Sequence, residues 1–66
     1  MKFKTTVTTN PDFGGRLFFV EAGRTFEPSD YEDAYGVTVP DTEAAAVQAQ
    51  AAQLKPGEWL QVDHSE

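Results

Sequence analysis

Alternating hydrophobic and polar side chains mark three segments of the chain as β-strands. Residues 2–8 alternate and are rich in threonine, which favours an extended backbone. Residues 16–22 hold four consecutive apolar side chains, a pattern typical of a strand that is central or covered on both faces. Residues 58–64 predict a third strand, with Leu60 and Val62 on the same face.

The connection between the first two strands has the composition of a turn. Pro11 fixes its own φ, Asp12 is able to hydrogen-bond the backbone that follows it, and the glycines at positions 14 and 15 permit positive φ. We expect these two strands to form an antiparallel hairpin with Asp12 at its tip. The pattern leaves open whether the third strand pairs with the first strand or with the second.

A short helix is predicted next. Pro28 suits a first helical turn, Ser29 and Glu32 have the spacing of a capping box, and Gly36 provides a left-handed stop. These signals predict a helix of two turns that begins at Pro28 or at Asp30.

This first helix is expected to carry its charge on one side. At about 100° per residue, Asp30, Glu32 and Asp33 share a polar arc, while Tyr31 and Tyr35 turn the other way. The helix would then hold these negative charges in a fixed arrangement.

A second helix is predicted from residues 41–54, with Asp41 or Thr42 as its cap. Pro40 biases the residue before it towards extended backbone, so the helix begins after it. Its buried stripe is expected to consist of Ala44, Val47, Ala51 and Leu54. The resulting order is β-β-α-α-β. We therefore predict one α+β domain over residues 1–66, in which two helices pack on one face of a three-stranded, mostly antiparallel sheet.

The charge balance restricts the partners. Eleven acidic and five basic residues give a net charge of −6, which argues against direct binding to nucleic acid or to an anionic membrane. The charge instead favours a basic protein as the partner. The alternative explanation is that the negative charge only keeps a small protein soluble. The chain has no cysteine, and no signal peptide or membrane-spanning run is expected from its apolar segments, so we expect an intracellular protein.

Catalytic chemistry is not expected. The single histidine, His64, lies in a polar terminal stretch with Asp63 and Glu66, and strand alternation sends Asp63 and His64 to opposite faces. No metal site, no cofactor and no nucleophile motif is predicted from this pattern. General acid catalysis needs a buried carboxyl group, whereas Glu32 and Asp33 are expected on a polar arc of the helix.

Two further residues each have a structural and a functional interpretation. Asp12 after a proline is typical of a turn, but at a loop tip its side chain projects towards a partner. Tyr31 is typical of a core anchor under a helix, yet a tyrosine beside acidic residues is also a common interface anchor.

Several segments of the chain together resemble one protein family. They are residues 8–15 (TTNPDFGG), 19–23 (FVEAG), 31–37 (YEDAYGV), 51–55 (AAQLK), 57–60 (GEWL) and His64. In this order the sequence is similar to the type I-F anti-CRISPR inhibitors conventionally numbered seven, which are encoded by phages and prophages of Pseudomonas-like hosts. The similarity spans nearly the whole chain.

This resemblance implies an inhibitor of the type I-F surveillance (Csy) complex that works in the host bacterial cytoplasm as a monomer. Members of the family bind the large subunit where it reads the protospacer-adjacent motif, and their acidic residues stand in for DNA phosphates. By position, the resemblance implies partner contacts at Asp12, Glu27, Tyr31, Glu32 and Asp33.

The chain departs from the family at one point. Directly after Glu27, where the family has a second acid, this sequence has Pro28, and Asp30 is acidic where the family tends to be uncharged. Asp30 is thus a further candidate contact with no assigned role. The alternative interpretation of the whole chain is a small acidic phage structural or assembly protein with a merely solvated acidic face.

Overall fold

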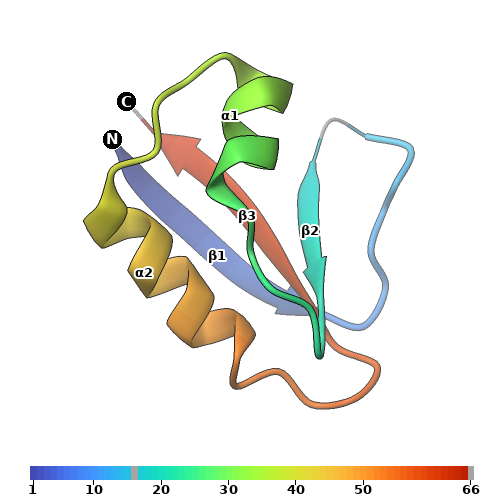
Figure 1. Cartoon of the computed structure of the whole chain (residues 1–66). Helices are drawn as coiled ribbons and strands as arrows, with labels where there is room; N and C mark the ends of the chain where they lie inside the picture. Colours follow the sequence, from blue (N-terminus) through green and yellow to red (C-terminus); the bar gives the residue numbers. More distant parts are fainter. Residues whose placement is uncertain (16, 66) are drawn as a thin grey trace.

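The computed structural model describes residues 1–15 and 17–65, and it confirms the predicted order of elements (Figure 1). The elements are β1 (Lys2–Thr8), β2 (Phe18–Glu21), α1 (Pro28–Tyr35), α2 (Asp41–Ala51) and β3 (Trp59–Ser65). The protein is therefore an α+β domain. The second strand was predicted to begin at Arg16, which lies outside the described residues.

The predicted hairpin of the first two strands is wrong. The strands are ordered β1-β3-β2, so β3 lies in the middle and pairs antiparallel with both neighbours. Val62 shows this directly, because it is opposite Thr5 on one side and Phe18 on the other. β1 and β2 consequently run parallel at opposite edges, and residues 9–17 carry the chain from the end of one to the start of the other (Figure 1).

Burial explains why β3 takes the central position. Leu60 and Val62 are each only 1% exposed, and the central position gives them a neighbouring strand on both sides as well as cover from the helices. The turn at Asp12 does form, since its carbonyl oxygen accepts a hydrogen bond from Gly15 N at 3.4 Å. A local turn of this kind does not impose a strand register, unlike a two-residue hairpin loop, and so it does not force β1 and β2 together.

Both helices cover the same face of the sheet, as predicted (Figure 1). Tyr31 of α1 and Val47 of α2 belong to one hydrophobic core with Leu60 and Val62 of β3. The buried members of that core are Val20, Phe26, Tyr31, Val39, Val47, Ala51, Leu60 and Val62. Ala44 packs against it, which confirms the predicted stripe of the second helix for Ala44, Val47 and Ala51, and Leu54 also packs there although it lies beyond the end of α2.

The opposite face of the sheet is covered in part by Phe13, which belongs to the connection between β1 and β2. Phe13 lies against Phe19 and Trp59, with ring centroids 5.5 and 5.1 Å away and rings nearly perpendicular. Edge-to-face contacts of this kind are favourable for aromatic quadrupoles. The apolar run of the second strand is thus buried on one face by helices and shielded on the other by a loop.

The boundaries of α1 agree with the prediction, whereas the cap and the end of α2 differ from it. α1 begins at Pro28, and Gly36 ends it in the left-handed conformation with φ of 66°. α2 is capped by Pro40, with no side-chain cap from Asp41 or Thr42, and it ends at Ala51 before the predicted end. Neither helix in the described part of the chain has the length and hydropathy needed to cross a membrane.

We expect the central strand to be the most sensitive part of the fold. Leu60→Ala should lower the free energy of unfolding by about 3 kcal/mol, because it removes a buried side chain from a small core. Val7 of β1 is 53% exposed, and Val7→Ala should cost less than about 1 kcal/mol. Urea denaturation followed by circular dichroism measures both values. Equal costs would contradict the central position of β3.

Candidate functional site

Helix α1 is held in place by Tyr31, whose side chain is completely buried. Its ring lies 5.0 Å from that of Phe3 in β1 and 5.2 Å from that of Phe18 in β2, between ring centroids. Its hydroxyl lies 2.5 Å from Nδ1 of His64 in β3, within hydrogen-bonding distance. One side chain of α1 therefore contacts every strand of the sheet.

Two expectations about these residues need correction. Tyr31 was expected at the partner-binding surface, but a side chain with 0% exposure offers a partner no area, so its role is to position α1. His64 was expected in a frayed terminal stretch, but it is half-buried against Tyr31 and Tyr35. The alternation that puts Leu60 and Val62 on the inner face also puts His64 there, and that signal could have found it.

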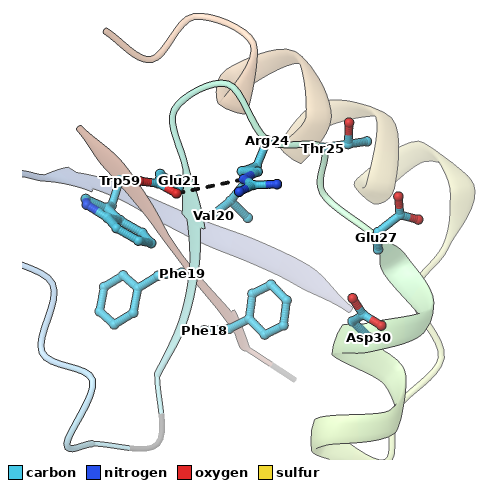
Figure 2. Close-up of a pocket in the computed structure, with 9 residues that line it drawn as sticks. All are labelled: Phe18, Phe19, Val20, Glu21, Arg24, Thr25, Glu27, Asp30 and Trp59. Atoms are coloured by element: carbon cyan, nitrogen blue, oxygen red, sulfur yellow. Dashed lines mark ion pairs between the residues drawn. The ribbon is translucent and has the colours of Figure 1, made fainter. Parts of the chain in front are cut away.

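Three exposed carboxylates, at intervals of three residues, lie at the start of α1 and along the helix. We call Glu27, Asp30 and Asp33 the acidic row. Side chains three apart are neighbours on a helix surface, so Asp30 and Asp33 lie beside each other, and Glu27 precedes them at the N-cap. Figure 2 shows Glu27 and Asp30 where the chain enters α1. Within the described residues, no member of the row forms an ion pair.

The start of α1 is compatible with this charge. Glu27 is the N-cap residue but makes no side-chain capping bond, so its carboxylate stays available. Asp30 lies in the first turn, where the helix dipole favours a negative charge. The segment that leads into α1 is tied to α2, because Phe26 N donates a hydrogen bond of 2.7 Å to Oε1 of Gln48. The row is therefore presented on a fixed backbone.

Glu32 does not belong to this exposed surface in the way that the sequence suggested. The predicted capping box with Ser29 is wrong, because no side chain caps the helix start. Oε2 of Glu32 instead accepts a hydrogen bond of 2.8 Å from the N–H of Val39, and the residue is half-buried. This carboxylate therefore fastens the linker between the helices onto α1, and only part of it faces solvent.

Asp12 is exposed on a separate segment, the loop of residues 9–17. Its Oδ1 accepts a hydrogen bond of 3.1 Å from Gly14 N, so the side chain stabilises its own turn. Asp12 was predicted at the tip of a hairpin. It lies instead in the connection that passes from one edge of the sheet to the other. The structure thus brings Glu27, Asp30 and Asp33 together and places Asp12 apart from them.

Arg24 lines a groove together with Glu27 and Asp30, but it is paired with another acid. Nε of Arg24 lies 3.9 Å from Oε1 of Glu21, with both side chains exposed. An exposed pair of this length contributes little to stability, and among the described residues no cation forms an ion pair with the row.

The described residues do not assemble a metal site. In residues 1–15 and 17–65, no three His, Asp or Glu side chains converge on a common position. His64 faces Tyr31, whereas Asp63 is exposed and accepts a hydrogen bond from the N–H of His64 at 2.8 Å. Glu66, the other acid of this terminal stretch, lies outside the described residues.

Burial makes the stability of the fold sensitive to alkaline pH through Tyr31. Burial, with the negative charges of ionised Tyr35 and Asp63 as smaller causes, raises the pKa of Tyr31 from 10.0 to about 12. As pH rises from 10 to 12, the unfolded chain loses this proton and the folded chain keeps it. The contribution of Tyr31 to the free energy of unfolding should therefore be fully present below pH 10. The free energy of unfolding should fall by roughly 2–3 kcal/mol as the pH rises towards 12.

Tyr31→Phe provides the control for this pH dependence. The variant should lose about 1 kcal/mol at neutral pH, because the hydrogen bond to His64 is gone, and it should lack the alkaline fall. Urea denaturation across the alkaline range measures both effects. An unchanged alkaline fall in the variant would exclude Tyr31 as its source.

Glu32 and Asp33 should differ in their effect on stability although they are adjacent. Glu32→Ala should lower the free energy of unfolding by about 1–2 kcal/mol, because it leaves the buried N–H of Val39 without a partner. Asp33→Ala should change it by less than about 0.5 kcal/mol, since its side chain is exposed. Thermal and urea denaturation of the two variants make the comparison, and equal losses would contradict the assigned role of Glu32.

No protein-family model and no curated protein sequence matches this chain.

Proposed function

We propose that this protein inhibits the type I-F CRISPR surveillance complex by binding its large subunit where that subunit recognises the protospacer-adjacent motif. The protein acts without catalysis, as a mimic of DNA phosphates that prevents the target duplex from docking. The observation that carries this proposal is the acidic row, three exposed carboxylates with no cationic partner in the described part of the chain.

A row of this kind suits a site built for a DNA backbone. Such a site presents lysine and arginine side chains in fixed positions, and charge-assisted hydrogen bonds to carboxylates are among the stronger polar contacts. The net charge of −6 adds long-range attraction, which speeds the encounter of oppositely charged surfaces. The fixed backbone of α1 also reduces the ordering cost of binding.

The departure from the family at Pro28 fits this arrangement. Pro28 is the first residue of α1, and its ring suits a position where a backbone donor is not needed. Asp30 lies three residues after Glu27 and so continues the acidic row. We assign to Asp30 the charge that the family carries directly after Glu27.

The other contacts implied by the resemblance take different roles in the proposal. Asp12 forms a second point of contact from the loop of residues 9–17, separate from the row. Glu32 offers only the part of its carboxylate that Val39 does not use. Tyr31 contributes indirectly, by holding the helix that carries the row.

Competition for target DNA tests the proposal. Purified type I-F complex is mixed with a labelled duplex that carries the motif, and this protein is added in increasing amounts. We expect loss of duplex binding, a co-eluting complex of the two proteins, and weaker competition as salt is raised. Undisturbed duplex binding without co-elution would reject the proposal and favour the small acidic structural or assembly protein.

Charge-neutral variants identify the surface. Glu27→Gln combined with Asp33→Asn should weaken competition by about tenfold or more, because it removes two contacts while keeping side-chain size. Asp41→Asn, which removes an exposed acid at the start of α2, is the matched control and should compete like the parent protein. Both variants should give the same circular dichroism spectrum as the parent protein. Full activity of the double variant would exclude the acidic row as the contact surface.

A further inference from the structure

The outer edge of β2 is open for pairing with another strand. β2 is the last strand of the sheet order, and it pairs only with β3 within the described residues. Ala22 N donates to Glu58 O at 3.1 Å, and the same register places Val20 opposite Leu60. Hydrogen-bonded pairs alternate along an antiparallel ladder, so the N–H and C=O of Phe19 point away from β3.

A groove of about 240 Å³ follows this edge. It is lined by Phe18, Phe19, Val20, Glu21, Arg24, Thr25, Glu27, Asp30 and Trp59. Figure 2 shows that its two sides differ in chemistry. Phe18 and, beyond it, the carboxylates of Glu27 and Asp30 lie on the side of α1, whereas Phe19 and Trp59 lie on the other side of the strand.

We propose that this edge binds an extended, lysine- or arginine-bearing segment of a partner protein as an added β-strand. Backbone pairing with Phe19 supplies affinity that does not depend on sequence. Side chains of an extended segment alternate between two faces, so one set meets Glu27 and Asp30 and the other set meets Phe19 and Trp59. The segment that fits best thus alternates a basic residue with an apolar one.

Charge selects a basic segment over a second copy of this chain. Pairing two copies through β2 would bring two acidic rows, and two chains of net charge −6, towards each other. Residues 18–21 also contain no lysine and no proline, two residue types that commonly hinder strand addition at a sheet edge. The one charged residue in β2, Glu21, is paired with Arg24.

This inference goes beyond the proposed function, because it concerns backbone pairing and does not require the surveillance complex. Glu27 and Asp30 are shared by both proposals. The test below contains no CRISPR component, so either proposal is able to fail while the other stands.

Titration of the ¹⁵N-labelled protein with a short peptide tests the inference. The probe is an end-capped hexapeptide of alternating lysine and valine at low ionic strength. We expect saturable chemical-shift changes along β2 and slower hydrogen exchange at the amide of Phe19, because this N–H gains a partner. No saturable change along β2 would overturn the proposal.

Two altered peptides separate backbone pairing from charge. The same peptide N-methylated at every residue keeps its side chains but loses every backbone donor, and it should bind at least about tenfold more weakly. A peptide that alternates glutamate and valine should not bind. If the methylated peptide bound as tightly as the unmethylated one, backbone pairing would not contribute to binding. That result would overturn strand addition.

Matched protein variants locate the peptide. Glu27→Gln with Asp30→Asn should weaken binding of the lysine–valine peptide by about threefold to tenfold, whereas Asp41→Asn should leave it unchanged. An equal loss of peptide binding in the double variant and in Asp41→Asn would show that the peptide binds outside this groove. Concentration-dependent self-association through β2, seen by sedimentation, would assign the edge to a second copy and likewise overturn the proposal.

Discussion

The burial of Tyr31 is the interaction on which the arrangement of this protein depends. A helix of eight residues is too short to be stable alone, so α1 exists because its inner side packs on the sheet. Tyr31 provides that packing, with its ring against Phe3 and Phe18 and its hydroxyl at His64. Because these three partners lie on β1, β2 and β3, the same contact that holds the helix also ties the edge strands to the centre.

The acidic row follows from this constraint. With Tyr31 directed inward, the residues at positions 27, 30 and 33 are exposed, and the chain places a carboxylate at each of them. Like charges three apart on a helix repel by a few tenths of a kcal/mol, a cost that the packing of the inner side easily offsets. The result is a negative surface whose geometry is set before any partner arrives. Such a surface suits recognition by fixed cations, and the open edge of β2 lies beside it.

Local signals in the sequence predict the elements well and their pairing poorly. Pro28, Gly36 and the stripe around Val47 act within a few residues, and each is confirmed. The position of β3 between the other strands depends on contacts between distant residues, which no local pattern reveals. For the same reason the expected capping role of Glu32 is wrong, since its true partner, Val39, lies beyond the helix. The acids of the row were predicted, but the sequence does not tell an exposed Asp33 from a half-buried Glu32.

We propose that the acidic row meets the cations of the motif-recognition site on the surveillance complex. An electron cryomicroscopy structure of that complex with this protein bound would show the contact itself. We expect the carboxylates of Glu27, Asp30 and Asp33 to face lysine or arginine side chains of the large subunit at hydrogen-bonding distance, with the backbone of α1 unchanged. A structure in which these carboxylates face solvent while another surface makes the contact would contradict it.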